Sequence, residues 1–183
     1  MRKILEGNKV FFRLVEEKDL AKRVEWINDP DVQRYLHFDY PTSFARTKKW
    51  FDKIVFDKTR VDFSIFEKQS KEYIGFCGFI NIDVPVLKAE FYAVIGDKNY
   101  WKRGYGTEVY ILLTNYGFLE LGLSRIYAYL NTENNASLKT FKKIGWKVEG
   151  TLRKDIFAHG KIYDRNVVSI LRNEWENNNV YDI

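Results

Sequence analysis

The sequence has little cysteine, little proline and no long apolar run. It contains one cysteine, Cys77, and three prolines among 183 residues. A single cysteine cannot form an intrachain disulfide, so the fold does not depend on oxidation. Because Cys77 lies in the apolar stretch 74–80, we interpret it as a buried strand residue and not as a nucleophile. No run approaches the ~18 apolar residues of a membrane span, and segment 1–8 lacks the apolar core of a signal peptide. We therefore expect a cytoplasmic protein that does not contact membranes.

The composition supports one folded domain. Hydrophobic residues make up 45% of the chain and aromatic residues 17%, enough for a large core and too many for a disordered chain. We expect a single domain over residues 8–176, followed by a tail at 177–183. The net charge is +5, but 30 basic residues are interleaved with 25 acidic ones. A nucleic-acid binder would need clustered cations with exposed stacking rings, so we expect no nucleic-acid partner.

Hydrophobic periodicity predicts an α/β (α+β) fold with a mostly antiparallel sheet of six to seven strands and one embedded strand–helix–strand unit. Asp29 is the expected N-cap of a short helix that Pro30 opens, and residues 159–160 are the expected hairpin turn. The strands are expected at 10–14, 61–66, 72–82, 89–95, 124–130, 146–157 and 161–171, and the helices at 16–28, 30–36, 41–56, 104–121 and 134–144.

The segment from Trp101 to Glu108 separates a strand from the strongest predicted helix. A helix N-terminus offers unbonded N–H groups and a partial positive charge, both of which attract a phosphate. Glycines in the turn let the backbone approach an anion closely, and two cations precede the first glycine. The pattern is neither a dinucleotide-binding fingerprint nor a P-loop. It predicts a pyrophosphate cradle, which we expect to consist of Lys102, Arg103, Gly104, Tyr105, Gly106 and Thr107.

Four ordered segments resemble the GNAT superfamily of N-acetyltransferases, and its RimJ/RimL-type branch in particular. The run 101–106, Trp-Lys-Arg-Gly-Tyr-Gly, is similar to the family's acyl-CoA loop, Gln/Arg/Trp-x-x-Gly-x-Gly/Ala. Residues 134–146 resemble its Asn-x-x-Ser segment followed by Lys-x-Gly-aromatic. Residues 12–30 and 160–175 are similar to the branch's first segment and final hairpin.

The resemblance implies a GNAT fold in which a central sheet, flanked by helices, splays apart between the strands at 89–95 and 124–130. Acetyl-CoA would be the co-substrate, with no metal, and the amine would attack the thioester directly in a ternary complex. The backbone of Tyr92, Ala93, Val94 and Ile95 would pair with pantetheine. Asn134 would bind the pantetheine arm, although an N-cap role suits it equally.

Two proton transfers accompany such a reaction, because the amine must lose a proton and the leaving thiolate gains one. Glu90 is the expected base, with a cross-strand ion pair as its structural alternative, and Glu108 is a weaker candidate. The family's tyrosine acid falls at Phe141 here, which cannot donate a proton. Ser137 is therefore the expected acid and a further cofactor contact.

The acceptor pocket is expected to include Trp26, Asn28, Tyr35, Tyr40 and His159. The resemblance suggests a protein N-terminus as acceptor, and the aromatic and Asn-rich first helices suggest an amino sugar or another small amine. A polyamine or an aminoglycoside is a third possible acceptor. Since segment 16–57 is not strongly acidic, such polycations are disfavoured. Phe141 also leaves open a non-catalytic acyl-CoA-binding module. A homodimer is compatible with the sequence, which does not determine the oligomeric state.

Overall fold

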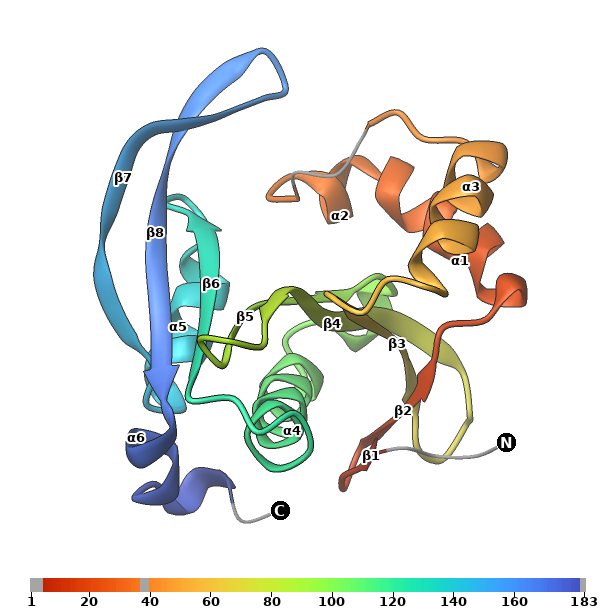
Figure 1. Ribbon diagram of the computed structural model, residues 1–183. Helices are drawn as coiled ribbons and strands as arrows, with labels where there is room; N and C mark the ends of the chain where they lie inside the picture. Colours follow the sequence, from red (N-terminus) through yellow and green to blue (C-terminus); the bar gives the residue numbers. More distant parts are fainter. Residues whose placement is uncertain (1–4, 37–39, 182–183) are drawn as a thin grey trace.

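The computed structural model describes residues 5–36 and 40–181, and it contains one eight-stranded sheet (Figure 1). The strand order is β1-β2-β3-β4-β5-β6-β8-β7, and every neighbouring pair is antiparallel except β5 and β6. The strands are β1 (Leu5–Glu6), β2 (Val10–Leu14), β3 (Val61–Glu67), β4 (Tyr73–Asp83), β5 (Lys88–Ile95), β6 (Arg125–Asn131), β7 (Lys147–Ala158) and β8 (Lys161–Leu171). The predicted α/β fold is confirmed. The sheet exceeds the predicted six to seven strands because Leu5 and Glu6 pair with β2.

The helices follow the predicted order with shorter bounds. Asp29 caps α2 as predicted, since its side chain accepts a hydrogen bond from the backbone N–H of Asp31. His159 and Gly160 form the predicted hairpin turn, with φ values of 50° and 76°. The C-terminal helices α6 and η3 were not predicted. The helices are η1 (Glu17–Asp19), α1 (Leu20–Asn28), α2 (Pro30–Gln33), α3 (Phe44–Ile54), η2 (Lys98–Tyr100), α4 (Tyr105–Leu119), α5 (Asn135–Lys143), α6 (Arg172–Glu176) and η3 (Asn179–Tyr181). None of these described helices is long and apolar enough to cross a membrane.

Helices cover both faces of the sheet. In Figure 1, α4 lies against one face near β4 and β5, whereas α1, α2 and α3 lie over the other. β5 contributes to both layers because side chains alternate along a strand. Phe91, Ala93 and Ile95 belong to the large core that includes α4, and Tyr92 and Val94 belong to the smaller cluster beneath α1.

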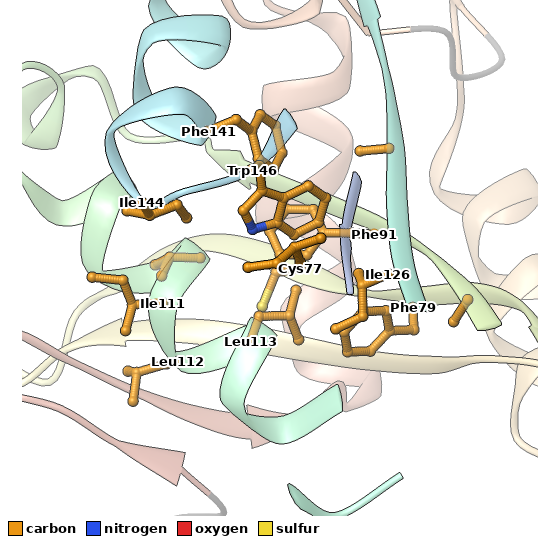
Figure 2. Packing of buried hydrophobic residues seen from close by; sticks show 14 of the residues in the cluster. Cys77, Phe79, Phe91, Ile111, Leu112, Leu113, Ile126, Phe141, Ile144 and Trp146 are labelled. Carbon is orange, nitrogen blue, oxygen red and sulfur yellow. The ribbon is translucent and has the colours of Figure 1, made fainter. Parts of the chain in front are cut away.

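The large core is rich in aromatic rings. Figure 2 shows Phe91 from β5 close to Phe141 and Trp146, and the ring centroids of Phe141 and Trp146 are 4.5 Å apart. Cys77 lies in the same core with no exposed surface, which agrees with its predicted packing role. Burial raises the pKa of its thiol well above the usual value, so it is not a reactive nucleophile.

The sheet splits between β5 and β6. Their parallel ladder has only three pairs, the last of which joins Glu90 to Tyr127. Beyond that pair, β5 continues along β4 as far as Ile95, and β6 continues along β8 as far as Asn131. The two strands therefore diverge, as predicted, and among the described strands only β4 continues alongside β5 from Phe91 onward.

Candidate active site

A cavity of about 520 Å³ occupies the split between β5 and β6. Its walls come from both layers of the molecule, so it connects the α4 side of the sheet with the α1–α3 side. On the α4 and α5 side, the lining residues include Tyr110, Asn134, Ser137 and Phe141, with Phe91 and Ala93 from β5. On the other side they include Arg23, Tyr35, Arg46, Trp50, Arg60, Glu90 and Arg165.

The predicted cradle is an open turn at the start of α4. Gly104 is the N-cap residue with φ of 86°, a conformation that suits glycine. The indole N–H of Trp101 donates to the carbonyl of Ile95 at 2.7 Å, which fastens the turn to the end of β5. No described residue accepts a hydrogen bond from the backbone N–H groups of residues 105–107. A Cβ atom at Gly106 would meet nothing within 4 Å. The turn therefore has bare amides and free space, as a phosphate group requires.

Lys9, which was not among the predicted cradle residues, supports this turn. Its Nζ donates to the carbonyl of Arg103 at 2.9 Å and lies 5.4 Å from the ring centroid of Tyr105. The backbone N–H groups of Lys9 and Val10 donate to Oε1 of Glu108, at 2.6 and 3.1 Å. Glu108 thus binds the start of β2 to α4, and this structural role accounts for its carboxylate without a catalytic one.

Glu90 lies where β5 and β6 separate, on the cavity wall. Asn81 Nδ2 donates to its Oε2 at 2.9 Å. Burial is the main influence on the pKa of Glu90 and raises it above the usual value, while the hydrogen bond from Asn81 and the charge of Arg165 act in the opposite direction. A raised pKa brings a carboxylate closer to the range in which it can accept a proton at neutral pH.

Ser137 and Tyr110 lie next to each other on the α4 and α5 side of the cavity. The Tyr110 hydroxyl donates to Ser137 Oγ at 3.2 Å, and the Ser137 backbone N–H donates to Asn134 Oδ1 at 3.1 Å. Asn134 is therefore the N-cap of α5 and also lines the cavity. The ring centroids of Tyr110 and Phe141 are 4.6 Å apart, so the α4 tyrosine lies next to the position where the family tyrosine is missing.

The predicted acceptor residues separate into three groups. Tyr35 lines the cavity. Trp26 is 5% exposed and packs on Tyr73, with a ring-centroid distance of 4.7 Å. Asn28 exchanges hydrogen bonds with the Thr42 backbone at 2.9 and 3.0 Å.

Tyr40 and His159 meet each other at the end of the β7–β8 hairpin. Their ring centroids are 6.0 Å apart in an edge-to-face arrangement. The contact joins the hairpin tip to the segment before α3, and neither residue is among the described lining of the cavity.

The comparisons with known proteins agree with this geometry. The acetyltransferase (GNAT) domain model matches residues 9–147, so the chain belongs to the GNAT family. It is therefore an acetyl-CoA-dependent N-acetyltransferase. The uncharacterized N-acetyltransferase YoaA of Bacillus subtilis is 31% identical over 92% of this chain and 97% of its own length. Spermidine N(1)-acetyltransferase of Escherichia coli is 26% identical over 85% of this chain and 82% of its own length.

Solved structures show the same fold. Spermidine N-acetyltransferase from Vibrio cholerae, crystallised with CoA and spermine, has a TM-score of 0.87. It is 24% identical and covers 93% of this chain and 100% of its own. The RimJ/RimL-type branch remains a prediction.

Proposed function

We propose that this chain acetylates a primary amine by direct attack of the amine on acetyl-CoA within the split sheet. The observation that carries the proposal is the adjacency of two features. The β5–β6 ladder ends at Glu90, and the open turn with bare amides is fastened to the far end of the same strand by Trp101. A pyrophosphate at the turn would let the pantetheine arm run along β5 toward Glu90.

The residues around the split fit such a co-substrate. The edge of β5 that faces the split, over residues 92–95, offers backbone donors and acceptors to the pantetheine amides. Residues 103–107 supply N–H groups to the pyrophosphate, and Lys102 and Arg103 add positive charge. Asn134 uses Oδ1 for its cap, which leaves its Nδ2 group to donate to the pantetheine arm.

Glu90 is the proposed base. An amine with a pKa near 10 is mostly protonated at neutral pH, so it must lose a proton before its nitrogen can attack. Glu90 has the position, at the apex of the split, and the raised pKa that this step needs. It takes the proton directly or through a water molecule, and the new N–C bond then forms as the C–S bond breaks.

Ser137 is the proposed acid, and Tyr110 is its partner. Because Ser137 Oγ accepts the Tyr110 hydrogen, the serine's own hydrogen is available to the departing thiolate. Once Ser137 has given up that proton, Tyr110 can replace it and recover its own from solvent. The pair would thus do the work of the tyrosine that Phe141 replaces.

The acceptor remains a choice among amines. Spermidine, named for relatives of 26% identity, is one candidate. Recognition of a polycation requires several carboxylates, but Glu90 is the one acidic side chain in the described cavity lining. This scarcity of acidic groups favours the peptide N-terminus or the amino sugar over a polyamine.

An amine screen with detection of free CoA thiol tests the proposal. We expect thiol release that depends on the amine and equals the amount of N-acetyl product. Binding of acetyl-CoA without release by any amine would instead support the non-catalytic acyl-CoA-binding module.

A further inference from the structure

We propose that Asn81 is a positioning residue for acetyl transfer: its side-chain amide holds the Glu90 carboxylate in place to accept the proton of the acceptor amine. The inference rests on the proposed function, in which Glu90 is the base, and adds a second residue to that step. Asn81 lies on β4 directly after Ile80, which pairs with Glu90. It is not among the described lining of the cavity, so it would act through Glu90.

The position of Asn81 depends on a bulge in β4. Ile80 pairs with Glu90 and the next pair joins Asp83 to Lys88, so β4 contains one more residue than β5 over this stretch. Asn81 has a φ of 52° there, in the left-handed region that asparagine tolerates better than most residues. In a regular strand, Asn81 would point to the face opposite Ile80. Because a bulge redirects side chains, the Asn81 amide reaches the Glu90 carboxylate instead.

The segment between α3 and β3 holds the backbone of this bulge. The N–H of Ile82 donates to the carbonyl of Thr59 at 2.8 Å. Thr59 donates to Oδ1 of Asp57 through its backbone N–H at 2.8 Å and through its hydroxyl at 2.6 Å. None of these contacts uses the side chain of Asn81. A change of that side chain should therefore leave the bulge in place.

Asn81 makes a direct contact with the proposed base. Its Nδ2 donates to Oε2 of Glu90 at 2.9 Å, and no other side chain in the described part of the chain donates to this carboxylate. A hydrogen bond to one oxygen restricts the carboxylate and leaves Oε1 to accept a proton from the amine or from a water molecule. The same bond favours the ionised form, which is the form that a base requires.

Charged and titratable groups from two other strands also face Glu90. Burial raises the pKa of Glu90, and the hydrogen bond from Asn81 and the charge of Arg165 on β8 oppose this rise. Arg165 also pairs with Asp155, so its charge does not act on Glu90 alone. Burial, and then the charge of Glu90, raise the pKa of Tyr127 on β6, so this phenol is neutral near pH 7. Loss of the Asn81 amide should therefore raise the pKa of Glu90.

Two variants test the role of Asn81 while they keep the bulge. Asn81→Gly removes the amide, and glycine adopts a positive φ readily. Asn81→Asp keeps the shape of the side chain but places a second carboxylate beside Glu90, which disfavours ionisation of both. An NMR titration of the glutamate carboxyl carbons measures the pKa, and Glu90→Gln identifies the Glu90 signal. We expect the pKa of Glu90 to rise by about 0.5 in Asn81→Gly and by more in Asn81→Asp.

The kinetic test uses an amine that the screen identifies as an acceptor. The acid limb of kcat/KM should move to higher pH together with the pKa of Glu90, and kcat should fall about tenfold because the carboxylate is less well oriented. The KM for acetyl-CoA should not change. Leu87→Gly is the matched control, since Leu87 is a left-handed residue of the same hairpin, with φ of 54°, and does not line the cavity. It should change neither the pKa nor the profile.

The NMR titration requires no acceptor, so it separates this inference from the proposed function. An unchanged pKa of Glu90 in both Asn81 variants would overturn the positioning role, whatever the activity. A raised pKa with an unmoved acid limb would instead remove Glu90 as the base, and the positioning role would fail with it although the hydrogen bond acts on Glu90. A raised pKa with an acid limb that follows it would support both.

Discussion

Glu90 and Tyr127 form the last pair of the parallel ladder between β5 and β6. A carboxylate thus lies at the apex of the split, with the Ser137–Tyr110 hydrogen bond on another wall of the same cavity. The divergence of β5 and β6 therefore exposes the edge of β5. It also opens the cavity that the candidate base and the candidate acid both line.

Gly106→Glu tests the cradle without weakening the fold. A Cβ atom at this position meets no protein atom, and an acidic side chain is favourable in the first turn of a helix, so the variant should fold normally. Its carboxylate would repel the pyrophosphate, whereas alanine is no test because the family pattern itself allows alanine here. We expect the Kd for acetyl-CoA, measured by calorimetry, to rise tenfold or more while the melting temperature is unchanged or higher.

Gly150→Glu is the matched control, since its added Cβ atom also meets nothing within 4 Å but lies on β7. It should leave the affinity unchanged. Normal acetyl-CoA affinity in Gly106→Glu would exclude the turn as the phosphate site. Gly104 is a poorer test, because its positive φ strains any substitution.

Glu90→Gln should lower turnover at neutral pH by about 10²-fold, a typical contribution of a general base. Turnover should partly recover at high pH, where more of the amine is already neutral. The pH profile of kcat/KM checks this, and a loss that is the same at every pH would remove Glu90 from the base role.

Glu90→Gln should lower turnover but raise the stability of the fold at neutral pH. Burial raises the pKa of Glu90 above 4.5, so the folded state binds this proton more tightly than the unfolded state. Ionisation of Glu90 therefore costs stability as the pH rises from about 4.5 through the folded-state pKa. Denaturant unfolding should show Glu90→Gln to be more stable than the parent at pH 7, with the gain vanishing in acid. A variant less stable at pH 7 would show that the carboxylate stabilises the fold.

Ser137→Ala should reduce kcat about 10²-fold and leave the Kd for acetyl-CoA nearly unchanged. Tyr110→Phe removes only the hydroxyl that donates to Ser137 and keeps the ring beside Phe141. It should lower kcat less, and the double variant should be little worse than Ser137→Ala alone. Equal losses of kcat and affinity in Ser137→Ala would mean that the serine only binds the co-substrate.

Glu149 provides a test of the C-terminal half of the sheet. Its pKa is lowered to about 2, first by the hydrogen bond from Arg125, with Ser169 assisting. A lowered carboxylate pKa contributes stability above the unfolded value of 4.5, and this contribution is lost as the pH falls toward 2. Since the pair is partly exposed, Glu149→Gln should cost about 1 kcal/mol or less at pH 7 and nothing near pH 2. A pH-independent cost would point to packing instead.

The sequence predicted local features of the structure. The glycine turn before α4 and the caps at Asp29 and Asn134 depend on residues within a few positions of one another, so spacing identifies them.

Contacts between distant elements could not be predicted. Tyr110 of α4 meets Ser137 of α5, 27 positions further along the chain, and Arg23 of α1 and Arg60 next to β3 both lie over the Trp50 ring of α3. We predicted Trp26 to be a pocket residue. Because Gly96 has no side chain, the Trp26 indole packs directly against the Gly96 backbone, where a Cβ atom would lie 2.0 Å from Trp26 Cδ2. Hydrophobic periodicity along the sequence does not predict such a contact.

Amine-dependent release of CoA thiol by the unmodified protein, followed together with mass detection of the product, tests the central claim most directly. Acetyl transfer in the split sheet predicts one thiol and one N-acetylated amine per acetyl-CoA consumed, with no acetylated protein. Tight binding of acetyl-CoA with no thiol released by any amine, or an acetyl group held covalently on the protein during turnover, would contradict it.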